Sequence, residues 1–444
     1  MNIIKSFLIL GLLASSFTAF SAKVDPTRLF IQTDNIERLP KYKLIKSVKY
    51  LFDNHYIVNT DNAHRLATLL KNNPDVIDIK KNYHSEKSQL PTIEPFVVGV
   101  SQTSFKNTTR FFNDPKVDRI WSFESAALNG ISVNRSYNFP LSRPKEDIIV
   151  AVVDTGVDYN HEDLTEAMWH NPNEIPQNGI DDDQNGYVDD YYGINTLIKD
   201  NLGKATGDPM ASHSHGTHVA GTIAASQNNY TGVAGIAQRA KIMAIRAVPN
   251  NSDETDADVV ESFLYAAKHG ARLINCSFGK NHNEGGSIVE QTIEHIGKKY
   301  GVLVLAAAGN DYGRNIDKSK TYPASFTTDY LLVVASTSSS GALSWFSNVG
   351  KKSVDLAAPG SSIYSTVKNN RYANMSGTSM ATPTTTGVAA ELLSHYPEMG
   401  PLELKRILLT TVTKDKRFQR KMVSPGRVNL YHALQYTLEN LHNN

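Results

Sequence analysis

The sequence of 444 residues contains a single cysteine, Cys276, and this scarcity excludes several kinds of protein. One thiol cannot form an internal disulfide, and it cannot supply the ligands of a cysteine-rich zinc site. The charges nearly cancel, with 45 Lys and Arg against 44 Asp and Glu, so no basic excess points to nucleic acid. No segment after residue 22 has an apolar run long enough to cross a bilayer. We therefore expect a globular protein that binds neither nucleic acid nor, once a leader is removed, a membrane.

The first 22 residues have the pattern of a signal peptide. Lys5 supplies a positive charge, the apolar run FLILGLLA follows, and Ala19, Ser21 and Ala22 are small residues suited to cleavage. The alternative is a membrane anchor, but this run is shorter than the roughly 20 apolar residues that a spanning helix needs. The pattern predicts export, to the extracellular space or to a periplasm.

Three regions with different patterns of apolar and polar residues follow the leader. Residues 23–87 combine strand-like segments with a helical pattern at 63–72, which predicts a small α+β module of propeptide size. Residues 88–112 show no sustained period and are predicted to be a linker with processing sites. In residues 113–444, continuous apolar strands alternate with helical patterns. This alternation predicts an α/β fold with a doubly wound, mostly parallel sheet covered by helices on both faces.

Three polar residues occur where the ligand-binding crevice of such a sheet is expected, at the carboxyl ends of the strands. Asp154 ends an apolar strand in VVDTG, His215 begins a helix in SHGTHVAGT, and Ser379 begins another in SGTSMATP. A serine hydroxyl becomes nucleophilic when an imidazole takes its proton, and a carboxylate orients that imidazole. The three residues therefore predict a catalytic triad.

Each member of this set has an alternative role. Asp154 and Ser379 are residue types that also cap helices. The histidines of HSHGTH suggest a metal cluster, although they lack the HExxH arrangement of helical zinc proteases. A nucleophile of the lipase and esterase type would need GxSxG, whereas Ala381 stands in place of the second glycine.

The chain order Asp, His, Ser and the motifs DTG, HGTHVAGT and GTSMATP resemble those of subtilisin-like serine proteases, most closely the thermitase-like branch. AAAGN, NNYTGVAG, APGSSIYST and GRVNLYHALQY extend the resemblance over about residues 113 to 436. It implies a secreted endopeptidase that cleaves proteins and peptides through an acyl-enzyme intermediate. It also implies a precursor whose N-terminal module assists folding and inhibits the enzyme until self-processing. We expect a monomer without an organic cofactor.

The resemblance also implies how substrate and intermediate are held. The backbone N–H of Ser379, at the start of a helix, and the side-chain amide of Asn310 would stabilise the oxyanion. The alternative for Asn310 is a plain Gly-Asn turn. Lys280 stands where relatives often have a second glycine, so the neighbouring wall is expected to differ. The residues implied to bind the substrate are Ser277, Phe278, Gly279, Ala306, Ala307, Ala308 and Gly309.

Two oxygen-rich loops predict structural calcium. GIDDDQNGYVDD matches the first part of an EF-hand loop without its closing Glu, and an acidic solvated turn is the alternative. The ligands predicted in this loop are Asp181, Asp183, Asn185 and Asp190. By resemblance, NNYTGV would hold a second calcium through Asn229, together with Asp114 and Asp163. Hard oxygen ligands suit calcium better than zinc.

A second class of function stays open beside the peptidase. A catalytically silent binding protein on the same scaffold would be favoured by the loss of a triad residue. Asp154, His215 and Ser379 are all present, so the sequence favours an active enzyme.

Overall fold

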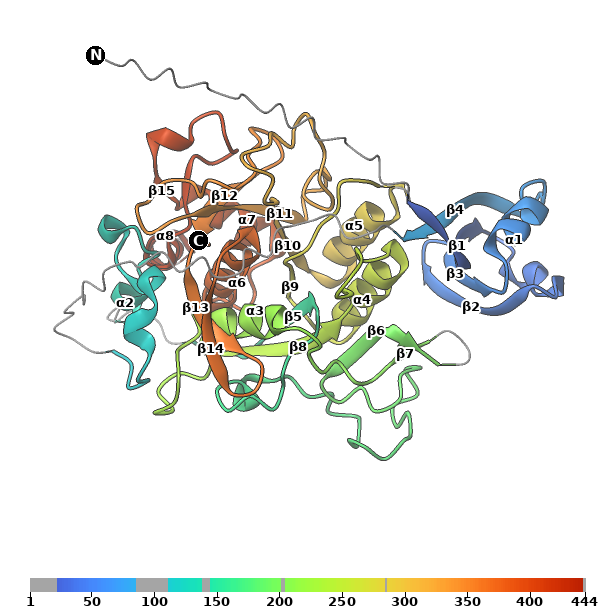
Figure 1. Ribbon diagram of the computed structural model, residues 1–444, viewed down its shortest axis with the longest axis horizontal. Helices are drawn as coiled ribbons and strands as arrows, with labels where there is room; N and C mark the ends of the chain where they lie inside the picture. The colour runs from blue at the N-terminus through green and yellow to red at the C-terminus, as the bar shows by residue number, and fades with distance from the viewer. Residues whose placement is uncertain (1–21, 85–110, 138–143, 201–203, 284–285, 442–444) are drawn as a thin grey trace, which may run out of the picture.

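The computed structural model describes most of the chain and shows a small unit beside a larger one (Figure 1). The described residues are 22–84, 111–137, 144–200, 204–283 and 286–441. The predicted signal peptide and most of the predicted linker therefore lie outside the described residues. Within the described part of the chain, no helix has the length and apolar character that a bilayer crossing requires.

The small N-terminal unit is a four-stranded antiparallel sheet in the order β2-β3-β1-β4, with one helix packed on it. Its elements are β1 (Lys23–Thr33), β2 (Ile45–Phe52), β3 (His55–Thr60), α1 (Ala63–Leu70) and β4 (Val76–His84). Leu66 and Leu70 lie one helical turn apart, and both are fully buried in one core with Leu29 and Val58 of the sheet. The unit has the α+β composition predicted for residues 23–87, and its role as a propeptide stays a prediction.

The larger unit is built on a ten-stranded sheet in the order β15-β16-β12-β11-β10-β9-β5-β8-β6-β7. Its edge pairs β15–β16 and β6–β7 are antiparallel, and the strands between them run parallel. The strands are β5 (Ile148–Asp154), β6 (Gly193–Lys199), β7 (Ala205–Thr206), β8 (Ala240–Arg246), β9 (Leu273–Cys276), β10 (Leu303–Ala307), β11 (Leu331–Thr337), β12 (Leu356–Pro359), β15 (Thr413–Lys414) and β16 (Gly426–Arg427). A separate hairpin is formed by β13 (Ile363–Val367) and β14 (Arg371–Met375).

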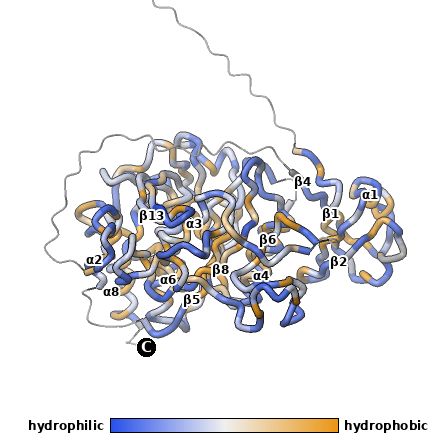
Figure 2. The backbone as a smooth tube through the Cα atoms, turned by 60° about the horizontal axis from the view of Figure 1, so that its bottom comes forward, coloured by the Kyte–Doolittle hydropathy of each residue, from blue (hydrophilic) through white to orange (hydrophobic). Residues whose placement is uncertain are grey.

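Helices cover both faces of this sheet because successive side chains of a strand point in opposite directions. In β5, Val150 and Val152 enter a core with α3, α6, α7 and α8, whereas Ala151 and Val153 enter a core with α4 and α5. The helices are α2 (Val133–Ser136), α3 (Ser214–Ala224), α4 (Asp256–Lys268), α5 (Ile288–Tyr300), α6 (Thr378–His395), α7 (Pro401–Thr410) and α8 (Leu430–Leu441). Apolar residues gather inside the larger unit around β8 (Figure 2). The predicted doubly wound fold is confirmed.

Candidate active site

Asp154 and His215 meet at the carboxyl edge of the sheet. Asp154 is the buried last residue of β5, and His215 lies in the first turn of α3. The Nδ1 atom of His215 lies 2.8 Å from one carboxylate oxygen of Asp154 and 3.0 Å from the other. A carboxylate at Nδ1 orients the ring and leaves Nε2 as the nitrogen that can accept a proton. The aspartate and histidine predicted from the sequence therefore have the geometry of a carboxylate-oriented base.

The other two histidines of HSHGTH have separate partners. His213 is the N-cap of α3, and its side chain accepts a hydrogen bond from the backbone N–H of His215. His218 is fully buried, and its Nε2 lies 2.9 Å from the carbonyl of Ile363 and 3.2 Å from that of Ala373. Burial lowers the pKa of His218 to about 4. These separate contacts disfavour the metal cluster that the histidine pattern suggested.

Ser379 is the second residue of α6. The N-cap position belongs to Gly377, so a capping role for the Ser379 side chain is excluded. The hydroxyl of Ser379 donates to the carbonyl of Ser277 at 3.0 Å, and the hydroxyl of Ser277 donates to the carbonyl of Ser379 at 2.8 Å. These two bonds join the start of α6 to the end of β9, which is the parallel neighbour of β5. Ser379 is thereby placed at the same sheet edge as Asp154.

Asn310 lies just beyond β10 and contacts the first residue of α6. Its amide oxygen accepts hydrogen bonds from the backbone N–H and the hydroxyl of Thr378, each at 2.9 Å. The amide nitrogen is then the atom able to donate towards a substrate. A Cβ added to Gly377 would lie 3.4 Å from this nitrogen and 3.5 Å from the backbone nitrogen of Ser379. The two groups predicted to hold an oxyanion therefore converge on one small volume.

The two segments predicted to bind substrate both border the start of α6. Ser277–Gly279 follows β9, Ala306–Gly309 spans the end of β10, and these strands are parallel neighbours. The N–H of Gly309 donates to the hydroxyl of Thr378 at 3.1 Å. Gly309 has a φ of +99°, and a Cβ there would lie 2.4 Å from the side chain of Asn348, so glycine is required. Peptide binding by these segments stays a prediction.

Cys276 ends β9 close to these residues and is fully buried. Burial raises the pKa of its thiol well above the usual range, and the charges of Glu254 and Asp154 add to this effect. Because the thiolate is the nucleophilic form of cysteine, the burial of Cys276 disfavours it as a nucleophile.

An acidic cluster outside this edge has the composition of a cation site. Glu174, Asp183 and Asp190 present carboxylate oxygens within 4.8 Å of one another. One oxygen of Glu174 accepts from the N–H groups of Asp182 and Asp183, whereas Oε2 is buried and has no hydrogen-bond partner. Burial raises the pKa of both Glu174 and Asp190, and the charge of Asp190 adds to the shift of Glu174. Calcium would bind the unpaired oxygen and offset the repulsion, so the donor set fits it.

The other ligands predicted in this loop have different contacts. The carboxylate of Asp181 accepts from the N–H groups of Asn185 and Gly186 at 3.0 and 2.8 Å. The side chain of Asn185 presents its amide nitrogen, not its oxygen, to Asp183 and Asp190. Sequence reasoning missed Glu174, because an EF-hand pattern places its glutamate at the end of the loop, whereas Glu174 precedes the loop. The sequence did contain a signal for it, because Glu174 is the one glutamate in the acidic segment NPNEIPQNGIDDDQNGYVDD.

The second predicted calcium loop also brings its residues together. Asp114 and Asp163 are fully buried, and the amide nitrogen of Asn229 donates to Asp163 at 2.9 Å. The backbone N–H of Asn229 donates to Asp114 at 3.1 Å. Burial raises the pKa of Asp163 to about 6, and the charge of Asp114 contributes. Protein groups already satisfy the oxygens named here, so calcium at this loop stays a prediction.

Comparisons of the chain with a family model and with known proteins point to the same family. Residues 145–425 match the family described as Peptidase_S8, the subtilase family. The chain is 35% identical over 290 residues to thermitase from Thermoactinomyces vulgaris, a match that covers 65% of this chain and 88% of the relative. It is 30% identical over 355 residues to subtilisin-like protease 1 from Plasmodium berghei (strain Anka), covering 76% of this chain but only 56% of that protein.

A solved structure shows the same fold. The epidermin leader peptide processing serine protease from Staphylococcus aureus superposes with a TM-score of 0.67, covering 93% of this chain and 98% of that chain at 22% sequence identity. The superposition extends over nearly all of both chains and supports the arrangement of strands and helices described above.

Proposed function

The chain belongs to the subtilase family, and from this we propose that it is a secreted serine endopeptidase using Asp154, His215 and Ser379. The observation that carries the proposal is the 2.8 Å contact between His215 Nδ1 and Asp154, at the sheet edge where Ser379 begins α6. The signal-peptide pattern of the first 22 residues supports secretion.

The proposed reaction begins at the hydroxyl of Ser379. This hydroxyl turns from the carbonyl of Ser277 towards Nε2 of His215, which takes its proton as the oxygen attacks the substrate carbonyl carbon. The negative charge that forms on the carbonyl oxygen is held by the N–H of Ser379 and the amide of Asn310. His215 then protonates the leaving amine. Water replaces the amine and gives a proton to His215 as it attacks the acyl-enzyme, and His215 returns that proton to the oxygen of Ser379 as the acid product leaves.

A covalent probe tests this proposal. A fluorophosphonate that reacts with activated serine hydroxyls is expected to label the wild-type chain and to leave Ser379→Ala and His215→Ala unlabelled, because one lacks the nucleophile and the other its base. Ser376→Ala, a nearby serine outside α6, serves as the matched control and should label normally. If the folded wild-type chain is not labelled, the silent binding protein becomes the better interpretation.

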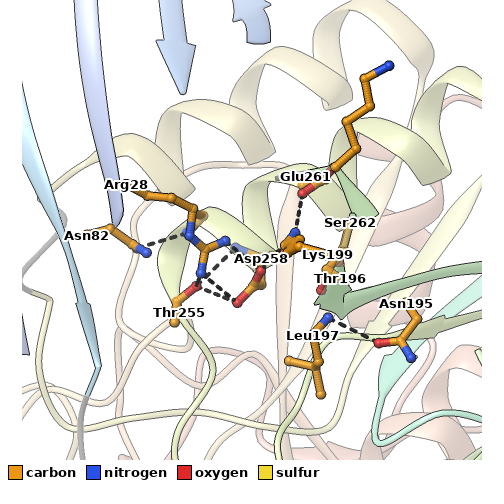
Figure 3. A network of polar contacts seen from close by, with 12 residues as sticks. Arg28, Asn82, Asn195, Thr196, Leu197, Lys199, Thr255, Asp258, Glu261 and Ser262 are labelled. Carbon is orange, nitrogen blue, oxygen red and sulfur yellow. Dashed lines mark hydrogen bonds and ion pairs between the residues drawn. The ribbon is translucent and has the colours of Figure 1, made fainter. Parts of the chain in front are cut away.

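We also propose that the N-terminal unit is a propeptide held on the larger unit by charge. Arg28 of β1 reaches α4, where its guanidinium lies 2.8 Å from Asp258 and 3.3 Å from the hydroxyl of Thr255 (Figure 3). Asp25 orients the same guanidinium from within the unit at 2.9 Å. Burial opposes ionisation of Asp258, but the charges of Arg28 and Lys199 lower its pKa below the usual value.

A second pair of contacts lies on the next turn of α4. Lys49 of β2 and Lys199 of β6 bind the two carboxylate oxygens of Glu261 at 2.6 and 2.7 Å. Lys199 belongs to the larger unit and also lies 3.3 Å from Asp258. Both carboxylates therefore keep a cationic partner when Arg28 and Lys49 leave. This arrangement supports a propeptide that can be released without leaving unpaired buried charge.

Arg28→Ala is expected to shorten the lag before the full chain becomes active. Truncating one partner of a buried, hydrogen-bonded charge pair acts mainly on dissociation and costs at least about 2 kcal/mol, so release should be roughly 30-fold faster or more. The lag is measured by following hydrolysis of a peptide after the precursor is diluted into assay buffer. Arg38→Ala is the control, because Arg38 makes an exposed contact with Asp75 inside the same unit. Equal lags for both variants would contradict the role given to Arg28.

We further propose that Glu174, Asp183 and Asp190 hold a structural calcium ion. A metal that binds only the folded state adds about 2.7 kcal/mol at 100 times its dissociation constant. For a domain of this size, a chelator should therefore lower Tm by roughly 5 °C. Initial rates at low temperature should stay nearly unchanged, because the cluster lies outside the triad.

In Glu174→Gln, the chelator is expected to lower Tm much less than in the wild type, because the variant loses one of the three carboxylates. Glu398→Gln, an exposed glutamate elsewhere, is the matched control and should respond like the wild type. Identical melting curves of the wild type with and without chelator would end the calcium proposal. A full chelator effect in Glu174→Gln would instead place the ion at another loop.

A further inference from the structure

A small pocket lies beside the segment that follows β9. It has a volume of about 10 Å³, and the side chains around it include Asp256 and Val259 of α4, Phe278, Lys280 and Tyr322. This volume is room for about one water molecule. Lys280 occupies a position where subtilisin-like relatives often have a glycine. The pocket therefore has almost no free volume, and a long side chain forms part of its wall.

The pocket lies within reach of a peptide bound at Ser379. The carbonyl of Ser277 accepts the hydroxyl of Ser379 at 3.0 Å, and Phe278 and Lys280 follow in the chain. An extended chain advances at most about 3.6 Å per residue, so Lys280 lies within roughly 11 Å of Ser277. A substrate in an extended conformation covers the same distance in three or four residues. A substrate side chain close to the scissile bond can therefore face this pocket.

Lys280 is held in the pocket by both its side chain and its backbone. Its Nζ lies 2.8 Å from the carboxylate of Asp256, and both side chains are almost fully buried, with 6% and 5% exposed. Two backbone hydrogen bonds with Tyr322, of 2.9 and 2.7 Å, fix the segment around it. A buried ion pair gains little stability over apolar residues of the same volume, because both charges lose their hydration. Its consequence here is steric, since the lysine side chain forms part of the wall of a pocket that has almost no free volume.

Glu254, the other acidic residue that lines the pocket, adds little charge to it. Glu254 is also buried, with 4% exposed. Burial raises its pKa to about 8, although the charge of Lys280 opposes the shift. At neutral pH the protonated form of Glu254 predominates, and Lys280 and Asp256 neutralise each other. The pocket therefore lacks a net charge that would attract a charged substrate side chain.

We propose that Lys280, held by Asp256, is a specificity-determining residue that closes this pocket and restricts the substrate side chain facing it to small residues. The inference rests on the proposed peptidase function. A pocket that cannot accept additional methylene groups discriminates by about 10- to 200-fold per group in kcat/KM.

The test uses fluorogenic peptides with one constant residue before the scissile bond and alanine at the three preceding positions. Leucine or phenylalanine then replaces each of these alanines in turn. At one position, the wild type is expected to cleave the alanine peptide at least about 10-fold better than the bulky ones. If all three positions accept bulky residues as well as alanine, the proposal is overturned before a variant is made.

Two double variants separate volume from charge. Lys280→Ala/Asp256→Ala removes the ion pair and opens the pocket, whereas Lys280→Met/Asp256→Asn removes the charges and keeps the volume. We expect the first to raise kcat/KM for the bulky peptide about 10-fold or more relative to the alanine peptide. The second should keep the wild-type ratio.

An unchanged ratio in the opened variant would overturn the proposal, and so would an equal change in both variants, because charge would then set the preference. Hydrolysis of the all-alanine peptide and labelling by the serine probe report on the proposed function separately. If neither occurs in the wild type, the peptidase assignment has failed, and not the role of Lys280 alone.

Discussion

Ser379→Ala is expected to abolish peptide hydrolysis and to leave the chain at its full precursor length. We expect the variant to keep the fold. It loses the hydrogen bond from the Ser379 hydroxyl to the carbonyl of Ser277, but the carbonyl of residue 379 still accepts from the hydroxyl of Ser277. It loses the only atom proposed to attack the substrate carbonyl. Removal of the nucleophile lowers kcat by about 10⁶-fold in subtilisin, a member of the same family, and we expect a loss of the same order here. The mass of the chain purified from a protease-deficient host gives the result.

Wild-type enzyme added in trans supplies the control for this experiment. It should cleave the Ser379→Ala chain between the N-terminal unit and the larger unit, which shows that the processing site is accessible. Ser376→Ala, expressed in parallel, should process itself normally. A Ser379→Ala chain that reaches mature size without added enzyme would contradict self-processing, and the remaining proposals about the larger unit would not depend on it.

Asn310→Ala is expected to lower kcat by about 100- to 1000-fold while KM changes little. Loss of one oxyanion donor has this cost in subtilisin. The physical reason is that charge develops on the carbonyl oxygen only in the transition state, so the amide of Asn310 stabilises that state more than the bound substrate. Steady-state kinetics on one peptide substrate measure both constants.

Asn310→Asp separates donation from support of α6. Asn310 also accepts two hydrogen bonds from Thr378, so the alanine variant alone does not identify the cause of a loss. Aspartate keeps an acceptor for Thr378 but presents an anion to the oxyanion. If donation matters, the aspartate variant should lose at least as much turnover as the alanine variant. Normal turnover in Asn310→Asp would assign Asn310 to positioning α6.

Several elements were predicted correctly because their signals are local. The apolar strand before Asp154 and the helices after His215 and Ser379 follow from side-chain periodicity along a few residues. β1 shows where this reasoning fails. Pro26 lies inside it, and its pairing with β4 shifts register between Val24 and Leu29. A proline is tolerated at such an irregularity, but a sequence pattern cannot show where the irregularity occurs.

Functional residues outside the motifs were harder to predict than the elements. Glu174 lies before the acidic loop, so its approach to Asp183 and Asp190 depends on how the chain folds back. Lys280 is visible in the sequence as a departure from glycine, but its partner Asp256 is not, since the rest of α4 and all of β9 lie between the two in the chain. In each case the partner is missing from the local pattern because packing between elements selects it.

The sequence alone determined the chemistry that we propose for this protein, and the tertiary structure decided which side chains lie together. Asp154, His215 and Ser379 are identifiable because each motif combines a reactive residue with a local strand or helix signal. Arg28 and Asp258 are 230 positions apart, and nothing near either residue predicts their contact. Periodicity is a property of neighbouring residues, because burial of one face repeats every two or 3.6 positions. Long-range ion pairs depend instead on how two completed units dock, which no local stretch of sequence contains.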